Sequence, residues 1–96
     1  MFKEDKDREL ILELKEQVVN ALTFELIEPE VEALEDLHND IDSLILCKAE
    51  DYNAVKDAVK SHMLDIVCVL ELSPNYYIRK NILPIIDELT VDLFDF

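Results

Sequence analysis

Residues 25–47 decide the fold, and they read Glu25-Leu26-Ile27-Glu28-Pro29-Glu30-Val31-Glu32-Ala33-Leu34-Glu35-Asp36-Leu37-His38-Asn39-Asp40-Ile41-Asp42-Ser43-Leu44-Ile45-Leu46-Cys47. The stretch carries eight carboxylates and no Lys or Arg. If a helix begins at Pro29, its apolar positions form one stripe: Leu34, Leu37, Ile41, Leu44 and Ile45. The opposite face holds Glu32, Glu35, Asp36, Asn39, Asp40 and Asp42. This pattern predicts a helix that packs on one side and exposes negative charge on the other.

The composition favours helices throughout the chain. The 96 residues are 50% apolar and 33% charged, with a net charge of −14 and no glycine. Glycine supplies the positive-φ positions of hairpin turns, so a chain without it is easier to build from helices. We expect one all-α domain spanning residues 1–96, because the chain has no room for a second.

Helical spacing and corner residues divide the chain into four predicted helices. The first runs from Asp5 or Asp7 to about Ile27, and Glu28-Pro29 then interrupts it because proline disfavours helical geometry in the residue before it. The second spans about 30–47, and the third follows a corner at 48–53 and ends near Leu72. Ser73-Pro74 is a favoured pair for starting the fourth.

The last segment keeps a single apolar stripe on both sides of a proline. The stripe consists of Ile78, Ile82, Ile85, Leu89 and Leu93, and it passes through Pro84 without a change of phase. One helix kinked at Pro84 is therefore favoured over two separate helices. The predicted architecture is a small antiparallel four-helix bundle.

Charge excludes several classes of partner. With 23 acidic against nine basic residues, the chain repels nucleic acids and anionic membranes, and a basic protein surface is its natural complement. The longest apolar run, Ile66-Val67-Cys68-Val69-Leu70, is far shorter than a membrane span. We expect a soluble, cytoplasmic protein that binds neither nucleic acid nor membrane directly.

Motifs for catalysis and metal binding are missing or incomplete. Glu35 and His38 have the Glu-x-x-His spacing of di-iron bundles, but Val59 stands three residues before His62, so the second copy is missing. Cys47 and Cys68 have no zinc-ligand spacing and sit among apolar residues, which predicts two buried free thiols. The paired carboxylates have no predicted apolar pocket to separate their pKa values. The sequence predicts no metal, no cofactor and no enzymatic activity.

Two sets of residues are candidates for binding a partner. The first is the acidic surface, which we define as six carboxylates: Glu28, Glu32, Glu35, Asp36, Asp40 and Asp42. The second is the pair Tyr76 and Tyr77 at a helix start, where one side chain can be core and the other exposed. The tail Leu93-Phe94-Asp95-Phe96 either packs onto the bundle or presents aromatic rings to a partner.

The leading hypothesis is a binding protein that neutralises a basic partner, as an immunity protein or antitoxin covers a nuclease toxin. In general character the chain is similar to the small acidic helical immunity proteins, and the Tyr76-Tyr77 pair resembles one in the nuclease-colicin immunity proteins. The acidic motif that surrounds that pair is missing here, so no site residue is carried over.

Three other interpretations stay open. One is a phage anti-defence protein that mimics nucleic acid, which needs two parallel rows of charge. Another is an oligomerisation or regulatory subunit, including a homodimer, whose acidic face only keeps it in solution. In the plainest interpretation, the acidic helix is a solvated face with no partner at all.

Overall fold

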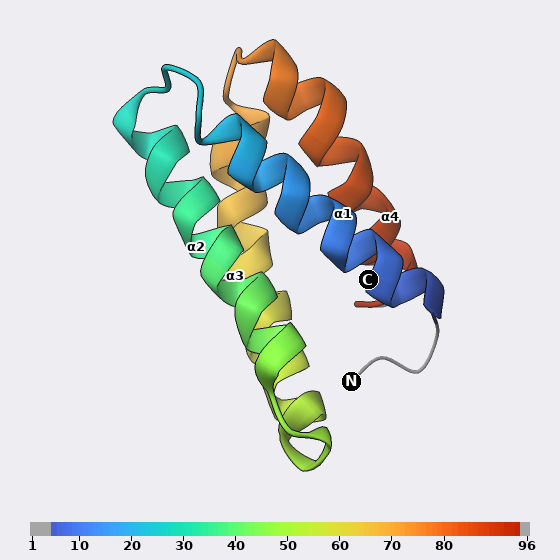
Figure 1. Ribbon diagram of the computed structural model, residues 1–96. Coiled ribbons are helices and arrows are strands. Elements are labelled where there is room, and N and C mark those ends of the chain that lie inside the picture. The colour runs from blue at the N-terminus through green and yellow to red at the C-terminus, as the bar shows by residue number, and fades with distance from the viewer. Residues whose placement is uncertain (1–4, 95–96) are drawn as a thin grey trace.

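Residues 5–94 are described by the structure, a computed structural model, and they fold into four α-helices (Figure 1). The helices are α1 (Asp5–Ala21), α2 (Glu28–Leu46), α3 (Tyr52–Glu71) and α4 (Leu83–Asp92). A 3₁₀ turn, η1 (Ala49–Asp51), precedes α3, and a π-helical turn, η2 (Ile78–Ile82), precedes α4. No strand occurs among these residues, so the all-α prediction is confirmed.

The helices form an antiparallel bundle in which sequential helices are neighbours. α1 packs against α2 and α4, and α3 packs against α2 and, less extensively, α4. In Figure 1, α1 and α3 run one way and α2 and α4 the other, and the α1–α4 pair is inclined to the α2–α3 hairpin. The predicted antiparallel four-helix bundle is therefore confirmed.

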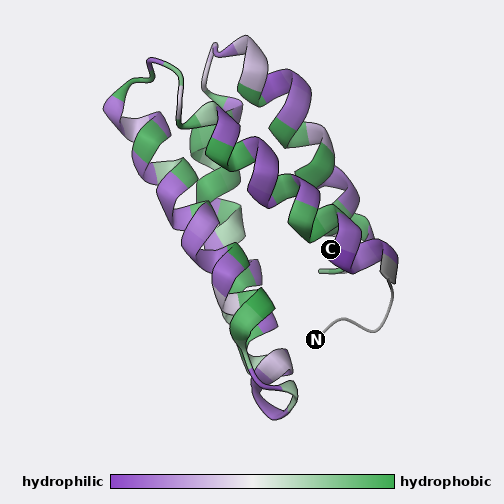
Figure 2. Cartoon of the chain, in the orientation of Figure 1, coloured by the Kyte–Doolittle hydropathy of each residue, from purple (hydrophilic) through white to green (hydrophobic). Residues whose placement is uncertain are grey.

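One core joins the apolar stripes of all four helices, and purple and green residues accordingly alternate along each helix (Figure 2). The stripe predicted for α2 is buried, except that Ile45 is half-buried. The tail packs onto the bundle at Leu93 and Phe94, which are buried, whereas Asp95 and Phe96 lie outside the described residues. The fully buried residues of the α2 stripe are Leu34, Leu37, Ile41 and Leu44, and fully buried residues of α1 include Ile11, Leu14 and Val18.

The first helix ends at Ala21, six residues earlier than predicted. The chain turns there: the Thr23 hydroxyl donates to the Asn20 carbonyl at 2.6 Å, and the Phe24 N–H donates to the Ala21 carbonyl at 3.1 Å. Phe24 then packs edge-on against Tyr77, with ring centroids 4.9 Å apart. A contact with a residue far along the chain thus outweighs the local helical spacing.

A buried carboxylate holds two corners of the bundle together. Glu30, in the first turn of α2, is 5% exposed, and its Oε1 accepts a hydrogen bond from the Ile27 N–H at 3.2 Å. This is half of a capping box, because Ile27 has no polar side chain to return the bond. The other oxygen, Oε2, accepts from the Ser73 hydroxyl. Glu30 therefore links the start of α2 to the corner between α3 and the last helix.

Asn75, rather than Ser73, caps the last helix. The Ile78 N–H donates to Asn75 Oδ1 at 3.0 Å, so the helix starts two residues later than the predicted Ser73-Pro74 start, and the Ser73 hydroxyl donates to Glu30 instead. Helical structure then continues from Tyr76 through Pro84 to Asp92. The irregularity predicted at Pro84 takes the form of the π turn η2, in which the Leu83 N–H donates to the Ile78 carbonyl. The wider turn accommodates the proline ring, which in a regular helix clashes with the carbonyl four residues earlier.

Replacing Glu30 tests the link between the two corners. Glu30→Ala should lower the free energy of unfolding by about 1–3 kcal/mol, because it leaves the Ile27 N–H and the Ser73 hydroxyl without their acceptor. Glu30→Gln keeps an acceptor of similar shape and should cost much less. Urea denaturation followed by circular dichroism measures both, and equal losses in the two variants would contradict the hydrogen-bonding role.

Candidate functional site

The acidic surface lies on the side of α2 that faces away from the core. Because α2 buries its apolar stripe, the remaining positions of the helix are directed outward. Glu28, Glu32, Glu35 and Asp36 are exposed there, as predicted. Asp40 and Asp42 are half-buried at the edges of the surface, where neighbouring helices supply basic partners for them.

On the side toward α1, Asp42 is paired. Lys15 Nζ of α1 lies 2.7 Å from Asp42 Oδ1, and His38 Nδ1 lies 3.5 Å from Asp42 Oδ2. The ion pair between two partly exposed groups has a small effect on stability, but it fixes the place of a positive charge beside the acidic surface. Lys15 lies ten residues before the stretch 25–47, and nothing in the spacing of the sequence indicates that it pairs with α2.

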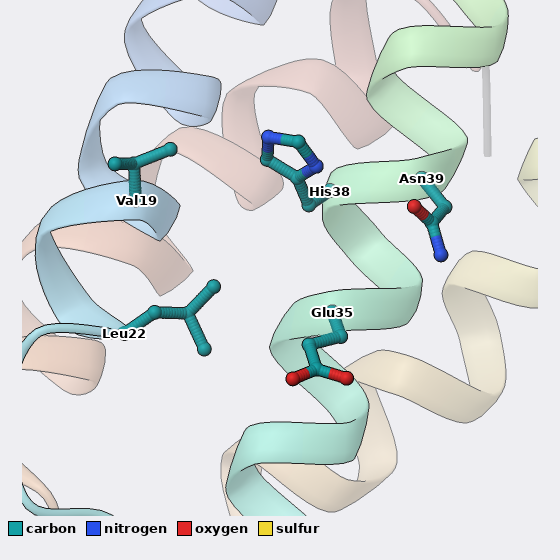
Figure 3. Close-up of a pocket in the computed structure, with 5 residues that line it drawn as sticks. All are labelled: Val19, Leu22, Glu35, His38 and Asn39. Atoms are coloured by element: carbon teal, nitrogen blue, oxygen red, sulfur yellow. The ribbon is translucent and has the colours of Figure 1, made fainter.

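A groove of about 280 Å³ lies between α1 and α2, with one apolar and one polar wall. Val19 of α1 and Leu22, just beyond the end of α1, form the apolar wall, and Glu35, His38 and Asn39 of α2 form the polar wall (Figure 3). In the close-up, Leu22 and His38 point into the space between the helices, whereas Asn39 points away from it. Val19 is 45% exposed, so the apolar stripe of α1 is wider than the core covers.

On the side toward α3, a histidine joins the acidic surface. His62 Nδ1 lies 2.7 Å from Asp40 Oδ2, and His62 Nε2 lies 3.9 Å from Asp36 Oδ2. The expectation that Asp40 is exposed is wrong, because its side chain is only 18% exposed. Burial raises the pKa of Asp40 above its ordinary value of 3.8, while the hydrogen bond and charge of His62 act in the opposite direction. Nothing in the spacing of the sequence indicates this contact between helices.

A second groove runs between α2 and α3. It consists of two adjoining hollows that share Pro29 and Val69, and their volumes are about 170 and 250 Å³. The first hollow has both charged and apolar side chains in its lining, which consists of Pro29, Glu32, Ala33, Asp36, His62, Asp65, Ile66 and Val69. The second is mainly apolar and lined by Ile27, Pro29, Glu30, Val69, Leu72, Ser73 and Pro74. We call the two together the α2–α3 groove.

The tyrosine pair lies apart from the acidic surface. Tyr77 is half-buried against Phe24 and donates its hydroxyl proton to Gln17, whereas Tyr76 is 72% exposed and stacks with Lys80, whose Nζ is 5.3 Å from the ring centroid. One core and one exposed tyrosine were predicted. They directly precede η2, and the backbones of η2 and α4 do not lie close to the backbone of α2. The eight candidate residues therefore occupy two separate surfaces.

The remaining candidate groups are dispersed. Cys68 is exposed and Cys47 is only half-buried, so the expectation of two buried thiols is wrong, and both thiols are free. Within residues 5–94, no group of three or more His, Cys, Asp or Glu side chains is arranged to hold a metal ion. None of the helices in the same range has the length and apolarity needed to cross a membrane.

Comparisons of the chain with protein-family models, with curated proteins and with solved structures gave no match. The features of the structure that bear on function are the acidic surface, the two grooves beside it and the exposed tyrosine.

The pH dependence of stability tests the environment of Asp40. An acid whose pKa is raised by folding binds its proton more tightly in the folded state, so its contribution to stability is present below the ordinary pKa and is lost as the pH rises through the folded-state pKa. Relative to Asp40→Asn, the wild-type protein should therefore lose stability as the pH rises from about 4, the ordinary pKa of an aspartate, through the higher pKa of the folded state. Urea titrations at a series of pH values measure this difference. Glu35→Gln, on the same helix but exposed, is the matched control.

That comparison also has a clear negative outcome. A difference between wild type and Asp40→Asn that stays constant or reverses with rising pH would show that the bond to His62 outweighs the burial of the carboxylate.

Salt dependence tests whether the pairs at the edges of the acidic surface balance its repulsion. With a net charge of −14, the folded protein should become more stable as salt rises from about 10 to 200 mM, because the Debye length falls from about 30 Å to below 10 Å. The urea midpoint should therefore increase over that range. A flat or falling midpoint would mean that local pairs such as Lys15–Asp42 dominate.

Proposed function

We propose that the protein is a non-enzymatic binding protein that neutralises a basic protein partner, as a cytoplasmic immunity protein or antitoxin neutralises a nuclease-type toxin. One observation supports this most directly: Glu28, Glu32, Glu35 and Asp36 are all exposed on one helix face, and α2 carries no Lys or Arg. A helix that only needs to stay in solution gains more from interspersed charges of both signs, which make i,i+4 pairs.

The mechanism of such a protein is electrostatic capture followed by coverage. Enzymes that act on nucleic acids carry basic substrate-binding surfaces, and a dense row of carboxylates is attracted to them over several ångströms of solvent. Complementary charge of this kind raises association rates by about 10- to 1,000-fold at low salt. Fast association favours an inhibitor that has to bind a toxin before it acts.

The same surface gives less support to mimicry of nucleic acid. A mimic needs two parallel rows of negative charge, whereas α3, the helix beside α2, presents Lys56, Lys60 and His62 among its acidic residues. Asp40, which would extend a second row, is bonded to His62 and half-buried. We therefore favour a basic protein surface as the target.

The test begins by isolating the partner. Immobilised protein should capture a basic protein from the cell that expresses it, and the captured protein should lose its activity on DNA or RNA when mixed in a 1:1 ratio. The triple variant Glu32→Gln/Glu35→Gln/Asp36→Asn should then associate with the purified partner about tenfold more slowly at low salt, with a weaker dependence on salt.

A control of equal charge is available on α1. Glu9, Glu13 and Glu16 are exposed on a stripe of α1 at helical spacing, and changing all three to Gln removes the same number of charges outside the acidic surface. Stopped-flow kinetics should show a larger loss for the α2 variant than for this control. Equal effects, or none, would mean that α2 is a solvated face and that the proposal is wrong.

A further inference from the structure

The end of the bundle where α2 begins and α3 ends exposes a cluster of apolar side chains. Leu72 is 86% exposed, Ile27 is 60% exposed and Val69 is 37% exposed, and Pro29 and Pro74 lie beside them in one hollow of about 250 Å³. Scattered apolar residues are ordinary on a surface, but a contiguous group around a hollow indicates an interaction site.

This hollow continues into the acidic part of the α2–α3 groove. Val69 and Pro29 line both hollows, and His62 and Asp36 line the far end. From Val69 to His62 along α3 is seven residues, or two helical turns, which corresponds to about 10 Å. The groove thus has an apolar end and an acidic end at a fixed separation.

The charges along the groove have one dominant sign. Glu32, Asp36 and Asp65 line its acidic end, and His62, the basic residue among the lining side chains, is already bonded to Asp40. Near the apolar end, Arg79 donates to the carbonyl oxygens of Glu71 at 2.8 Å and Ser73 at 3.0 Å, which ties its guanidinium to the end of α3. An occupant therefore has to combine an apolar group with positive charge.

The apolar hollow is formed before anything binds. Its base contains Glu30 and Ser73, whose hydrogen bond joins the start of α2 to the corner after α3. The second carboxylate oxygen is held by the Ile27 N–H, so the backbone beside the hollow is fixed as well. A preformed site spares a ligand the free-energy cost of ordering it.

We propose that the α2–α3 groove is the docking site for a basic amphipathic segment of the partner protein. An apolar side chain of that segment fills the hollow of Ile27, Val69 and Leu72, and a Lys or Arg about 10 Å away along the segment pairs with Glu32, Asp36 or Asp65. This inference rests on the proposed function and adds to it an anchor that long-range charge does not supply. A second copy of the chain fits poorly, because it would bring carboxylates against carboxylates.

A pair of synthetic peptides provides the probe. The first is a helix-forming peptide of about 14 residues, or four turns, with Leu on one face and Lys on the other. The second keeps every Lys and replaces each Leu with Ser. Each is titrated into the ¹⁵N-labelled full-length protein, and amide chemical shifts are followed.

The Leu-containing peptide should bind at least about tenfold more tightly than the Ser peptide, since it alone can bury an apolar side chain. Its shift changes should centre on the residues around Ile27, Asp65 and Leu72. Leu72→Asn should weaken binding of this peptide about tenfold. Asp65 lies outside the acidic surface of α2, and Asp65→Asn should weaken binding less, because an exposed ion pair contributes little.

Val91 offers a matched control. It is 68% exposed on α4, so Val91→Asn makes the same kind of change away from the groove and should leave binding unchanged. Because Leu72 and Val91 are both exposed, both variants should keep the wild-type fold, and the spectra of the free variants verify this.

Several outcomes would overturn the inference. These are equal binding of the two peptides, shift changes centred on Tyr76 or Val91, equal effects of Leu72→Asn and Val91→Asn, or no binding of either peptide. Electrostatic capture by α2 is judged separately, by its own kinetics with the purified partner. If the α2 charge variant slows association while Leu72→Asn has no effect, the proposed function stands and the groove is not the docking site.

Discussion

The one-sided burial of α2 is the constraint on which the rest of the structure depends. Leu34, Leu37, Ile41 and Leu44 are fully buried, and each such side chain contributes about 1.5–3 kcal/mol through removal from water. No rotation of α2 about its axis keeps this stripe in the core and hides the carboxylates as well. The acidic surface is therefore a consequence of the core, and the repulsion it creates is tolerated because the burial is larger.

The neighbours of α2 then determine how much of that charge is free to act. Lys15 of α1 and His62 of α3 reach the two edges of the surface and pair with Asp42 and Asp40. The central carboxylates, Glu32 and Glu35, make no ion pair within residues 5–94 of the kind seen at the edges. The arrangement places paired, structural acids at the borders and unpaired, accessible ones in the middle, where a partner would meet them.

Periodicity in the sequence predicts the stripes, because local spacing alone determines which face of a helix is apolar. It fails where a contact joins distant parts of the chain. The end of α1 depends on Phe24 meeting Tyr77, and Ser73 bonds Glu30 rather than capping a helix. Asp40 was predicted as exposed for the same reason, since nothing near it in the sequence indicates that His62 of the next helix lies 2.7 Å away.

The same failure explains why the sequence pointed to an acidic surface but not to the groove beside it. Ile27 and Leu72 are 45 residues apart, each at the boundary of a helix, where an apolar residue is easily taken for the end of a buried stripe. The antiparallel packing of α2 and α3 brings these two boundaries to one end of the bundle, and the bond between Glu30 and Ser73 joins them there. Charge of a single sign attracts every basic surface alike, so discrimination between partners has to come from shape and apolar contact. If the partner docks as proposed, the exposed leucine next to the hollow, at a fixed distance from a row of carboxylates, would provide both.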